Sequence, residues 1–572
     1  MSEAALSYHE PGIILILVQS SFLIVLNVAG ATVDYYLYCG LIAQVLLGMG
    51  WGAPGAALLS NDFQEVATQL GYLGLIAIIF EGGLSTSVKA VQQNLILSIC
   101  VALTGILLPV GFSYSLCALA SASNLQAFAA GAALCSTSLG TTFNLLKTTD
   151  MTSTRLGVVL TSAAMLDDVV GLIMVQVISN LGSGPNSFKA ISVVRPVFVS
   201  FGFAVVLILI CKYACKPIMN HISMPQMARS LLAKPVAYFL GCTVFLLALI
   251  TSASYAGTSV LFAAYLAGAS ISWLDANQTR SKNHPGENLN VRQQPPDNPT
   301  AAFKKGKLVP DVNKQGRSER EEDVDEVKEV SNEQLPSADF QQPPARQEPT
   351  PPPEGAEPET TTNPGILPGS VELHSLKRGQ VENSSRSLRM YNDYYAPSVE
   401  RLLKPFFFAS IGFSIPITKM CRGPVLWRGV TYAIIMAFGK LSCGLWLLRL
   451  SKLSNNPSGT TEKKRTAVSV MRPISMYPAS ILGSAMIARG EIGFLISALA
   501  ATNGIFNGEN KDADAPANES EIFLVVTWGI LLCTVAGPLA LGLLMRRVRR
   551  LQQKGPGPDG GKEDPLGIWA VD

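Results

Sequence analysis

The sequence predicts an all-α polytopic membrane protein of about thirteen transmembrane helices. Hydrophobic residues make up 48% of the 572 residues and charged residues only 15%, whereas an ordinary soluble domain has roughly 25% charged residues. The mean hydropathy is +0.30, and the formal net charge is +3. This composition excludes a nucleic-acid-binding protein, a disordered protein and a typical cytosolic enzyme.

Thirteen apolar runs are candidate membrane spans, because ~20 helical residues cross the hydrocarbon layer. Nine lie in a first membrane part, residues 1–274, and four in a second, residues 401–545. The first run has no basic segment before it and no clear cleavage site, so we expect a retained helix instead of a signal peptide. The runs lie near 11–30, 35–50, 66–83, 95–119, 124–146, 156–179, 191–211, 235–253, 256–273, 402–418, 428–449, 478–502 and 521–545.

A hydrophilic block, residues 275–400, separates the two membrane parts. It holds 36 of the 85 charged residues and 16 of the 35 prolines. Such a segment buries too little apolar surface to offset the conformational entropy that folding costs. We therefore expect a disordered loop, with a helix only where the chain leads into the span at 402.

The basic residues of the short connections predict the orientation, since cytoplasmic loops are enriched in Lys and Arg. The tail, residues 546–572, begins with a cluster of arginines and should be cytoplasmic. Thirteen spans then place the N-terminus on the outer side and the 275–400 loop in the cytoplasm. One predicted outer connection opposes this orientation, because it contains Lys419, Arg422 and Arg428.

The ten cysteines lie mostly inside or beside apolar runs, and no CxxC pair accompanies the four histidines. This pattern predicts neither a disulfide framework nor a zinc site. We expect the cysteines to be small apolar packing residues, and we expect no cofactor.

Two adjacent acids, Asp167 and Asp168, lie near the middle of the span 156–179. An ionisable side chain at that depth costs about 2.5–3.5 kcal/mol to insert, so it is a functional candidate by default. Neighbouring residues of a helix point about 100° apart. The two carboxylates therefore need two partners or two roles.

One basic residue, Lys440, is likewise central in the span 428–449. A buried ammonium either finds a carboxylate or loses its proton. Lys440 is therefore the predicted charge partner of the aspartates, with a purely structural partnership as the alternative. One lysine against two aspartates leaves one surplus negative charge, which a cation or a proton can neutralise.

Two stretches rich in Gly, Ser and Thr weaken the predicted helices of the fifth and twelfth spans. The first contains Thr137 and Ser138, and the second contains Arg489 and Glu491. Broken helices persist at membrane depth where they line a cavity, and matching breaks in two halves of a chain point to a transport site. As alternatives, the hydroxyls bond to their own backbone, and the two charged residues form a structural pair or neutralise a helix end.

Taken together, these residues resemble the cation/proton antiporter superfamily, the sodium/hydrogen exchangers, and most closely its thirteen-helix branch with a paired-aspartate motif. The resemblance covers roughly 11–275 and 400–545 but not the loop between them, which departs from the compact members. The segments that carry it occur in the order of the family: GLIAQVLLGMGWG, IIFEGGL, CSTSLGTT, AAMLDDVVG, VLFAAYLAGASI, FFFASIGFSI, GK at 439–440 and ARGEIGFLI.

The resemblance implies two inverted repeats, a core with two crossed broken helices, and a separate dimerisation domain, hence a homodimer. It also implies that Asp168 is the main carboxylate for the proton and the ligand of the transported metal ion. Asp167 would pair with Lys440 in one state. The residues that would surround the two breaks are Thr137, Ser138, Arg489 and Glu491.

The expected function is monovalent cation/proton antiport, in which Na+ or K+ exchanges for H+ across a plasma membrane or an endomembrane. A proton and a hard cation compete for the same carboxylate oxygens, and competition alone gives exchange if only the loaded site changes sides. If Lys440 also releases a proton, the ratio becomes two protons per cation and the exchange is electrogenic. The expected partners are these ions, the lipid bilayer and a second copy of the chain, without nucleic acid.

Three other functions fit these residues less well than secondary transport does. An intramembrane aspartyl protease also uses two membrane carboxylates, but they must come from two facing helices, and here they are adjacent on one. A non-transporting sensor or scaffold acting through the 275–400 loop would not need Asp167, Asp168 and Lys440 together. A channel lacks support because no filter-like sequence is visible.

Overall fold

The computed structural model describes most of both membrane parts. All described residues belong to one unit, which comprises Met1–Pro285 and Arg378–Asp572. Residues 284–384 lie outside the described ranges, and with them the prediction of a disordered loop. The described residues are 10–86, 94–149, 151, 154–181, 190–215, 235–283, 385–448, 475–507, 520–553, 566 and 569.

Every regular element in these ranges is helical, which confirms the predicted all-α class. The first membrane part contains α1 (Ile13–Leu37), α2 (Gly40–Trp51), α3 (Asn61–Leu84), α5 (Leu95–Ser113), α6 (Ser115–Leu119), α7 (Asn124–Cys135), α8 (Leu139–Thr148), α9 (Arg155–Leu181), α10 (Ala190–Ile210), α13 (Pro235–Ala256) and α14 (Val260–Asn283). The helices that follow the loop are α16 (Arg386–Tyr394), α17 (Ala396–Ser398), α18 (Lys404–Phe413), α19 (Ile417–Met420), α20 (Gly423–Leu441), α22 (Tyr477–Ile487), α23 (Glu491–Thr502) and α24 (Glu521–Gln553).

The molecule is a multi-pass membrane protein. Among the described residues, nine helical segments are long and apolar enough to cross a bilayer. The other four predicted spans, at 35–50, 124–146, 256–273 and 402–418, coincide with α2, the pair α7 and α8, α14 and α18. These helices are short, broken or polar at one end, so the count of thirteen spans stays a prediction.

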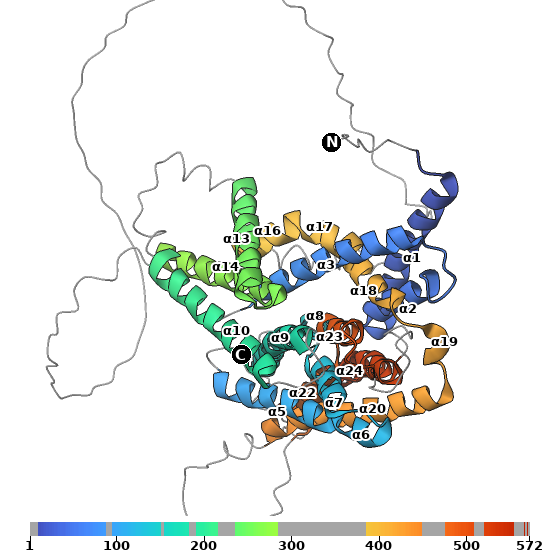
Figure 1. Ribbon diagram of the computed structural model, residues 1–572. Coiled ribbons are helices and arrows are strands. Elements are labelled where there is room, and N and C mark those ends of the chain that lie inside the picture. The colour runs from blue at the N-terminus through green and yellow to red at the C-terminus, as the bar shows by residue number, and fades with distance from the viewer. Residues whose placement is uncertain are drawn as a thin grey trace, which may run out of the picture. The chain divides into compact units, whose positions relative to one another are not determined.

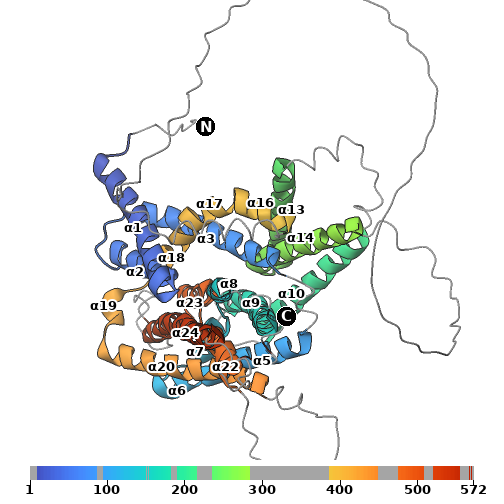
Figure 2. The same ribbon diagram turned by 180° about the vertical axis from the view of Figure 1, so that it is seen from behind.

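The helices form two groups, each packed mainly within itself (Figure 1). The first helix group contains α1, α2, α3, α13, α14, α16 and α18, and the second contains α5, α7, α8, α9, α20, α22, α23 and α24. Figure 2 shows the same separation from behind. Small residues let helix backbones approach closely, and the first group uses this at Gly268 of α14. A Cβ there would lie only 2.7 Å from the backbone nitrogen of Leu84 on α3.

Both broken helices belong to the second group. The chain is extended at Ser136 between α7 and α8, with φ −69° and ψ 146°. It is extended again at Gly490, with φ −136° and ψ −156°, just before α23 begins. The two breaks meet, because the backbone N–H of Ser138 donates to the carbonyl of Ala488 at 2.9 Å. The predicted interruptions therefore lie at one place in the fold.

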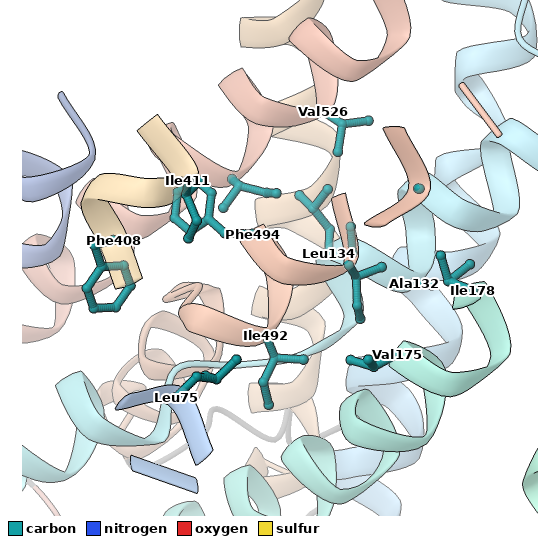
Figure 3. Close-up of a cluster of buried hydrophobic side chains, with 14 of the residues drawn as sticks. Leu75, Ala132, Leu134, Val175, Ile178, Phe408, Ile411, Ile492, Phe494 and Val526 are labelled. Carbon is teal, nitrogen blue, oxygen red and sulfur yellow. The ribbon is translucent and has the colours of Figure 1, made fainter. Parts of the chain in front are cut away.

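An apolar layer fills the contact between the two helix groups on one side of the breaks (Figure 3). The first group contributes Leu75 of α3 and Phe408 and Ile411 of α18. All of these side chains are buried, and they pack into one cluster with residues of α7, α9, α23 and α24. The second-group members labelled in Figure 3 are Ala132, Leu134, Val175, Ile178, Ile492, Phe494 and Val526.

Helices extend into both ends of the hydrophilic block 275–400, and the one at its end agrees with the helix expected before the span at 402. At its start α14 continues to Asn283, and at its end α16 begins at Arg386 and leads toward the span at 402. One carboxylate holds these ends together. Asp275 accepts a hydrogen bond from the backbone N–H of Ser387 at 2.8 Å and another from the Tyr238 hydroxyl at 3.0 Å.

Candidate functional site

The Lys440 ammonium lies at the α7 break with no solvent-exposed surface. It donates to a carboxylate oxygen of Asp167 at 2.6 Å and to the Thr137 hydroxyl at 2.9 Å. Its third hydrogen bond goes to the carbonyl of Cys135, the last residue of α7. An ammonium has three donors, so Lys440 uses all of them.

Asp167 is equally buried and is the ion-pair partner of Lys440. The oxygen that faces Lys440 also accepts a hydrogen bond from Thr137. Its other oxygen, Oδ1, has no hydrogen-bond partner in the described part of the chain. The structure thus brings Asp167, Lys440 and Thr137 together into one buried cluster, which we call the closed pair.

Asp168 points elsewhere, as expected from the angle between neighbouring helix residues. It is half-buried, and its Oδ1 accepts a hydrogen bond from the Ser136 hydroxyl at 3.1 Å. We call Asp168 the open carboxylate. The sequence predicts Thr137 and Ser138 as site residues but not Ser136, which directly precedes them.

Ser138 makes no hydrogen bond to either aspartate in the described part of the chain. Its backbone N–H bonds to Ala488, and its carbonyl accepts the Thr142 hydroxyl at 2.9 Å. It therefore joins the two breaks through its backbone. A Cβ on Gly490 would lie 2.9 Å from both Cβ and Oγ of Ser138, so a residue without a side chain is needed opposite it.

Arg489 is fully buried between the two breaks. Its Nη1 donates to the carbonyl of Ser136 at 2.8 Å, while Nε and Nη2 have no partner among the described residues. Neither Arg489 nor Glu491 forms an ion pair in the described ranges, so the predicted alternative of a structural pair between them is absent there. The alternative of a helix-end neutraliser agrees with the contact to Ser136, because the carbonyl ends of helices are partly negative.

Glu491 is the first residue of α23 and is half-buried. Gly171, one helical turn after Asp168, lies against both breaks. A Cβ on Gly171 would lie 2.9 Å from Cβ of Ser136 and 3.2 Å from Cγ2 of Ile492, the neighbour of Glu491. This close approach brings the start of α23 to the side of α9 that carries the open carboxylate.

The arrangement has two electrostatically different halves. The closed pair balances one negative charge with one positive charge and uses every donor of the ammonium. The open carboxylate has oxygen atoms available for an ion, and carboxylate and hydroxyl oxygens are ligands that hard cations prefer. No group of three or more His, Cys, Asp or Glu residues that could hold a metal ion occurs in the described ranges.

Comparisons with known proteins show what the chain is similar to. Residues 28–290 match the model of the transmembrane sodium/hydrogen exchanger family. The chain is 32% identical over 143 residues to the high-affinity Na+/H+ antiporter NhaS3 of Synechocystis, which is 25% of this chain and 31% of that protein. It is 27% identical over 158 residues to the Na+/H+–K+ antiporter GerN of Bacillus cereus, which is 27% of this chain and 40% of that protein. The matched segments thus span less than half of these relatives.

The fold is similar to that of the sodium proton antiporter MjNhaP1 from Methanocaldococcus jannaschii. The match has a TM-score of 0.51 at 13% sequence identity and covers 94% of this chain and 99% of that chain. The family match and the relatives confirm the predicted resemblance to the cation/proton antiporter superfamily, and the structural likeness supports the polytopic all-α fold.

Proposed function

We propose that this protein, a multi-pass membrane protein of the cation/proton antiporter superfamily, exchanges Na+ or K+ for H+ by alternating access at Asp168. The observation that carries the proposal is the position of Asp168. It is a half-buried carboxylate at the crossing of two broken helices, beside an aspartate whose charge is already balanced by Lys440. Broken helices that cross at membrane depth are where transporters bind ions.

Exchange follows from competition for one carboxylate. A proton and a monovalent cation bind the same Asp168 oxygens, with the Ser136 hydroxyl as a further oxygen ligand. An unloaded Asp168 carries a negative charge that is costly to move through a low-dielectric layer. Only the loaded site therefore changes sides, and each cation that moves one way is coupled to a proton that moves the other way.

The contacts of Lys440 favour one proton per cation. Its ammonium form has three acceptors, and a neutral amine would leave the closed pair with an uncompensated buried carboxylate. Breaking such a pair is costly. We therefore infer that Lys440 stays protonated and that the exchange is electroneutral, in preference to the alternative of two protons per cation.

The apolar layer suggests how access is restricted to one side. Val175 and Ile178 of the layer lie toward the end of α9, and Val526 lies near the start of α24. The basic-residue distribution places both of these helix ends on the outer side. The structure then corresponds to a state that is closed to the outside. We infer that the second helix group moves against the first to open that side and that the first group forms a homodimer contact.

For the transported ion and for the membrane, the proposal includes two alternatives each. The ion is Na+ or K+, since NhaS3 is named a Na+/H+ antiporter and GerN a Na+/H+–K+ antiporter. The membrane is a plasma membrane or an endomembrane, with the tail and the 275–400 loop in the cytoplasm. The assignment of the membrane and of the cytoplasmic side rests on the expectations derived from the sequence.

Proton exchange in proteoliposomes tests the proposal directly. An internal pH dye reports proton movement when Na+, K+ or Li+ is added to vesicles with wild type, Asp168→Asn or the control Asp62→Asn, whose side chain is exposed at the start of α3. We expect a cation-dependent dye response in wild type and in Asp62→Asn and none in Asp168→Asn. Exchange that persists in folded Asp168→Asn would contradict the proposal.

A further inference from the structure

The net charge at the two breaks is not set by Asp167, Asp168 and Lys440 alone. Arg489 is fully buried there as well and adds a second positive charge. With the closed pair neutral, Arg489 and Asp168 would cancel each other. The open side would then carry no net charge for a cation or a proton to neutralise, unless another carboxylate contributes.

Glu491 is a carboxylate that lies beside the second break, on the side of Asp168. It begins α23 directly after the second break, and its neighbour Ile492 lies against Gly171, one turn from Asp168. Glu491 is near enough to Asp168 for the two carboxylates to interact electrostatically, as the adjacent Asp167 does. Both Asp168 and Glu491 are half-buried, unlike the fully buried Asp167.

We propose that Glu491 is the second carboxylate of the cation site, so that a monovalent cation binds between Asp168 of α9 and Glu491 of α23. This inference rests on the proposed antiport function and deepens it. The site would be completed by residues from two elements, with the Ser136 hydroxyl from a third. The other charged or titratable groups that interact electrostatically with Asp168 are Asp167 beside it, Lys440 of α20 and Tyr265 of α14.

The added carboxylate makes the charge count consistent with one-for-one exchange. Asp168 and Glu491 contribute two negative charges and Arg489 one positive charge, which leaves one negative charge on the open side. One monovalent cation or one proton neutralises it. Both loaded states are then electrically equivalent, so neither carries net charge when the site changes sides.

A purely structural role for Glu491 is the competing explanation. An acidic residue in the first turn of a helix interacts favourably with the partly positive N-terminus, and Glu491 occupies such a position in α23. That role predicts that a Gln variant is less stable, but it predicts no change in the dependence on cations. The two roles are therefore separated by cation affinity, not by stability.

The experiment compares Glu491→Gln, Glu491→Asp and the control Glu65→Gln, an exposed residue of α3. Two quantities are measured with NaCl and KCl: the cation KM of dye-detected exchange in proteoliposomes, and the cation-dependent rise of the melting temperature of purified protein. We expect Glu491→Gln to raise the KM at least about tenfold, because one nearby charge at low effective dielectric is lost. The control should behave as wild type.

Glu491→Asp keeps the charge but moves it back by one methylene, so we expect a KM increase of about threefold to tenfold. This variant carries the test if the Gln protein does not fold. A third variant, Arg489→Gln combined with Glu491→Gln, restores the single negative charge. It should bind cations more tightly than Glu491→Gln alone.

A wild-type KM and a wild-type melting-temperature rise in folded Glu491→Gln would overturn the inference. So would an unchanged KM in Glu491→Asp, where that variant carries the test. Failure of the proposed function looks different, because exchange would then be absent in wild type or would persist in Asp168→Asn. If Asp168→Asn loses exchange while Glu491→Gln keeps the wild-type KM and melting-temperature rise, the antiport function stands and only the proposed role of Glu491 is wrong.

Discussion

The ammonium of Lys440 and the carboxylate of Asp167 form a fully buried ion pair. Such pairs contribute little net stability, because desolvation of both charges offsets their attraction. Removing one partner is different, since it leaves the other charge buried without compensation. The closed pair is therefore better explained as a device that fixes the charge state of one aspartate than as a source of stability.

A substitution at Lys440 tests this explanation. We expect Lys440→Met to lower the free energy of unfolding by about 3–5 kcal/mol, because Asp167 loses its positive partner. Asp167→Asn combined with Lys440→Met should recover much of that loss, since no charge is then left uncompensated. Thermal or chemical denaturation of the purified variants measures both effects. A double variant as unstable as Lys440→Met alone would show that Lys440 acts through packing.

Ser136 shows what sequence reasoning missed at the scale of single residues. The run Ser136, Thr137 and Ser138 lies outside any helix, with Ser136 in an extended conformation. Successive side chains of an extended chain point in opposite directions. Thr137 therefore faces Asp167, while Ser136 faces Asp168. Once an unwound stretch is predicted, the sequence also predicts that these neighbouring side chains point to opposite sides. The direction of each side chain could not be predicted, because it depends on how the two breaks meet.

At the scale of elements, each break is stabilised by groups from other elements. Ser138 bonds to Ala488 across the crossing, and Arg489 and Lys440 bond to the carbonyls that the end of α7 leaves free. The positions of both breaks could be predicted, because Gly, Ser and Thr weaken a helix locally. Their mutual contacts could not, since they join residues about 350 positions apart in the chain.

Element boundaries at the long loop were the least predictable feature. Composition changes sharply near residue 275, but α14 continues to Asn283 and α16 begins at Arg386. Tertiary contacts explain this. Asp275 binds the first turn of α16, and Arg386 lies 4.2 Å above the ring of Tyr238. A polar helix that is held by such contacts has no apolar run by which to recognise it.

For the whole molecule, the two helix groups give the proposed transport cycle its moving parts. The site residues belong to the second group, and the apolar layer joins it to the first (Figures 1 and 3). Composition alone predicted a polytopic membrane protein. The two-group arrangement followed only from the resemblance to a family, because apolar runs do not reveal which helices are neighbours.

The contact between Asp275 and Ser387 predicts that the membrane parts do not need the segment between them. We expect replacement of residues 286–377 by a short Gly/Ser linker to leave cation-dependent exchange within about twofold of wild type, because the two ends are already held together. Asp275→Ala in the shortened protein should lower the melting temperature by about 2 °C or more. Exchange assays and thermal unfolding check the two parts.

Two outcomes would contradict this prediction. Loss of exchange in a folded, shortened protein would mean that the replaced segment takes part in transport. An unchanged melting temperature in Asp275→Ala would mean that other contacts hold α16 to α13 and α14.

Proton release on cation binding tests the central claim most directly. Purified protein in weakly buffered solution is mixed with NaCl or KCl, and the released protons are counted against the bound cations for wild type and Asp168→Asn. Competition at one site predicts release that approaches one proton per cation as the pH falls, and none in Asp168→Asn. Cation binding without proton release in wild type, or undiminished release in Asp168→Asn, would contradict the account.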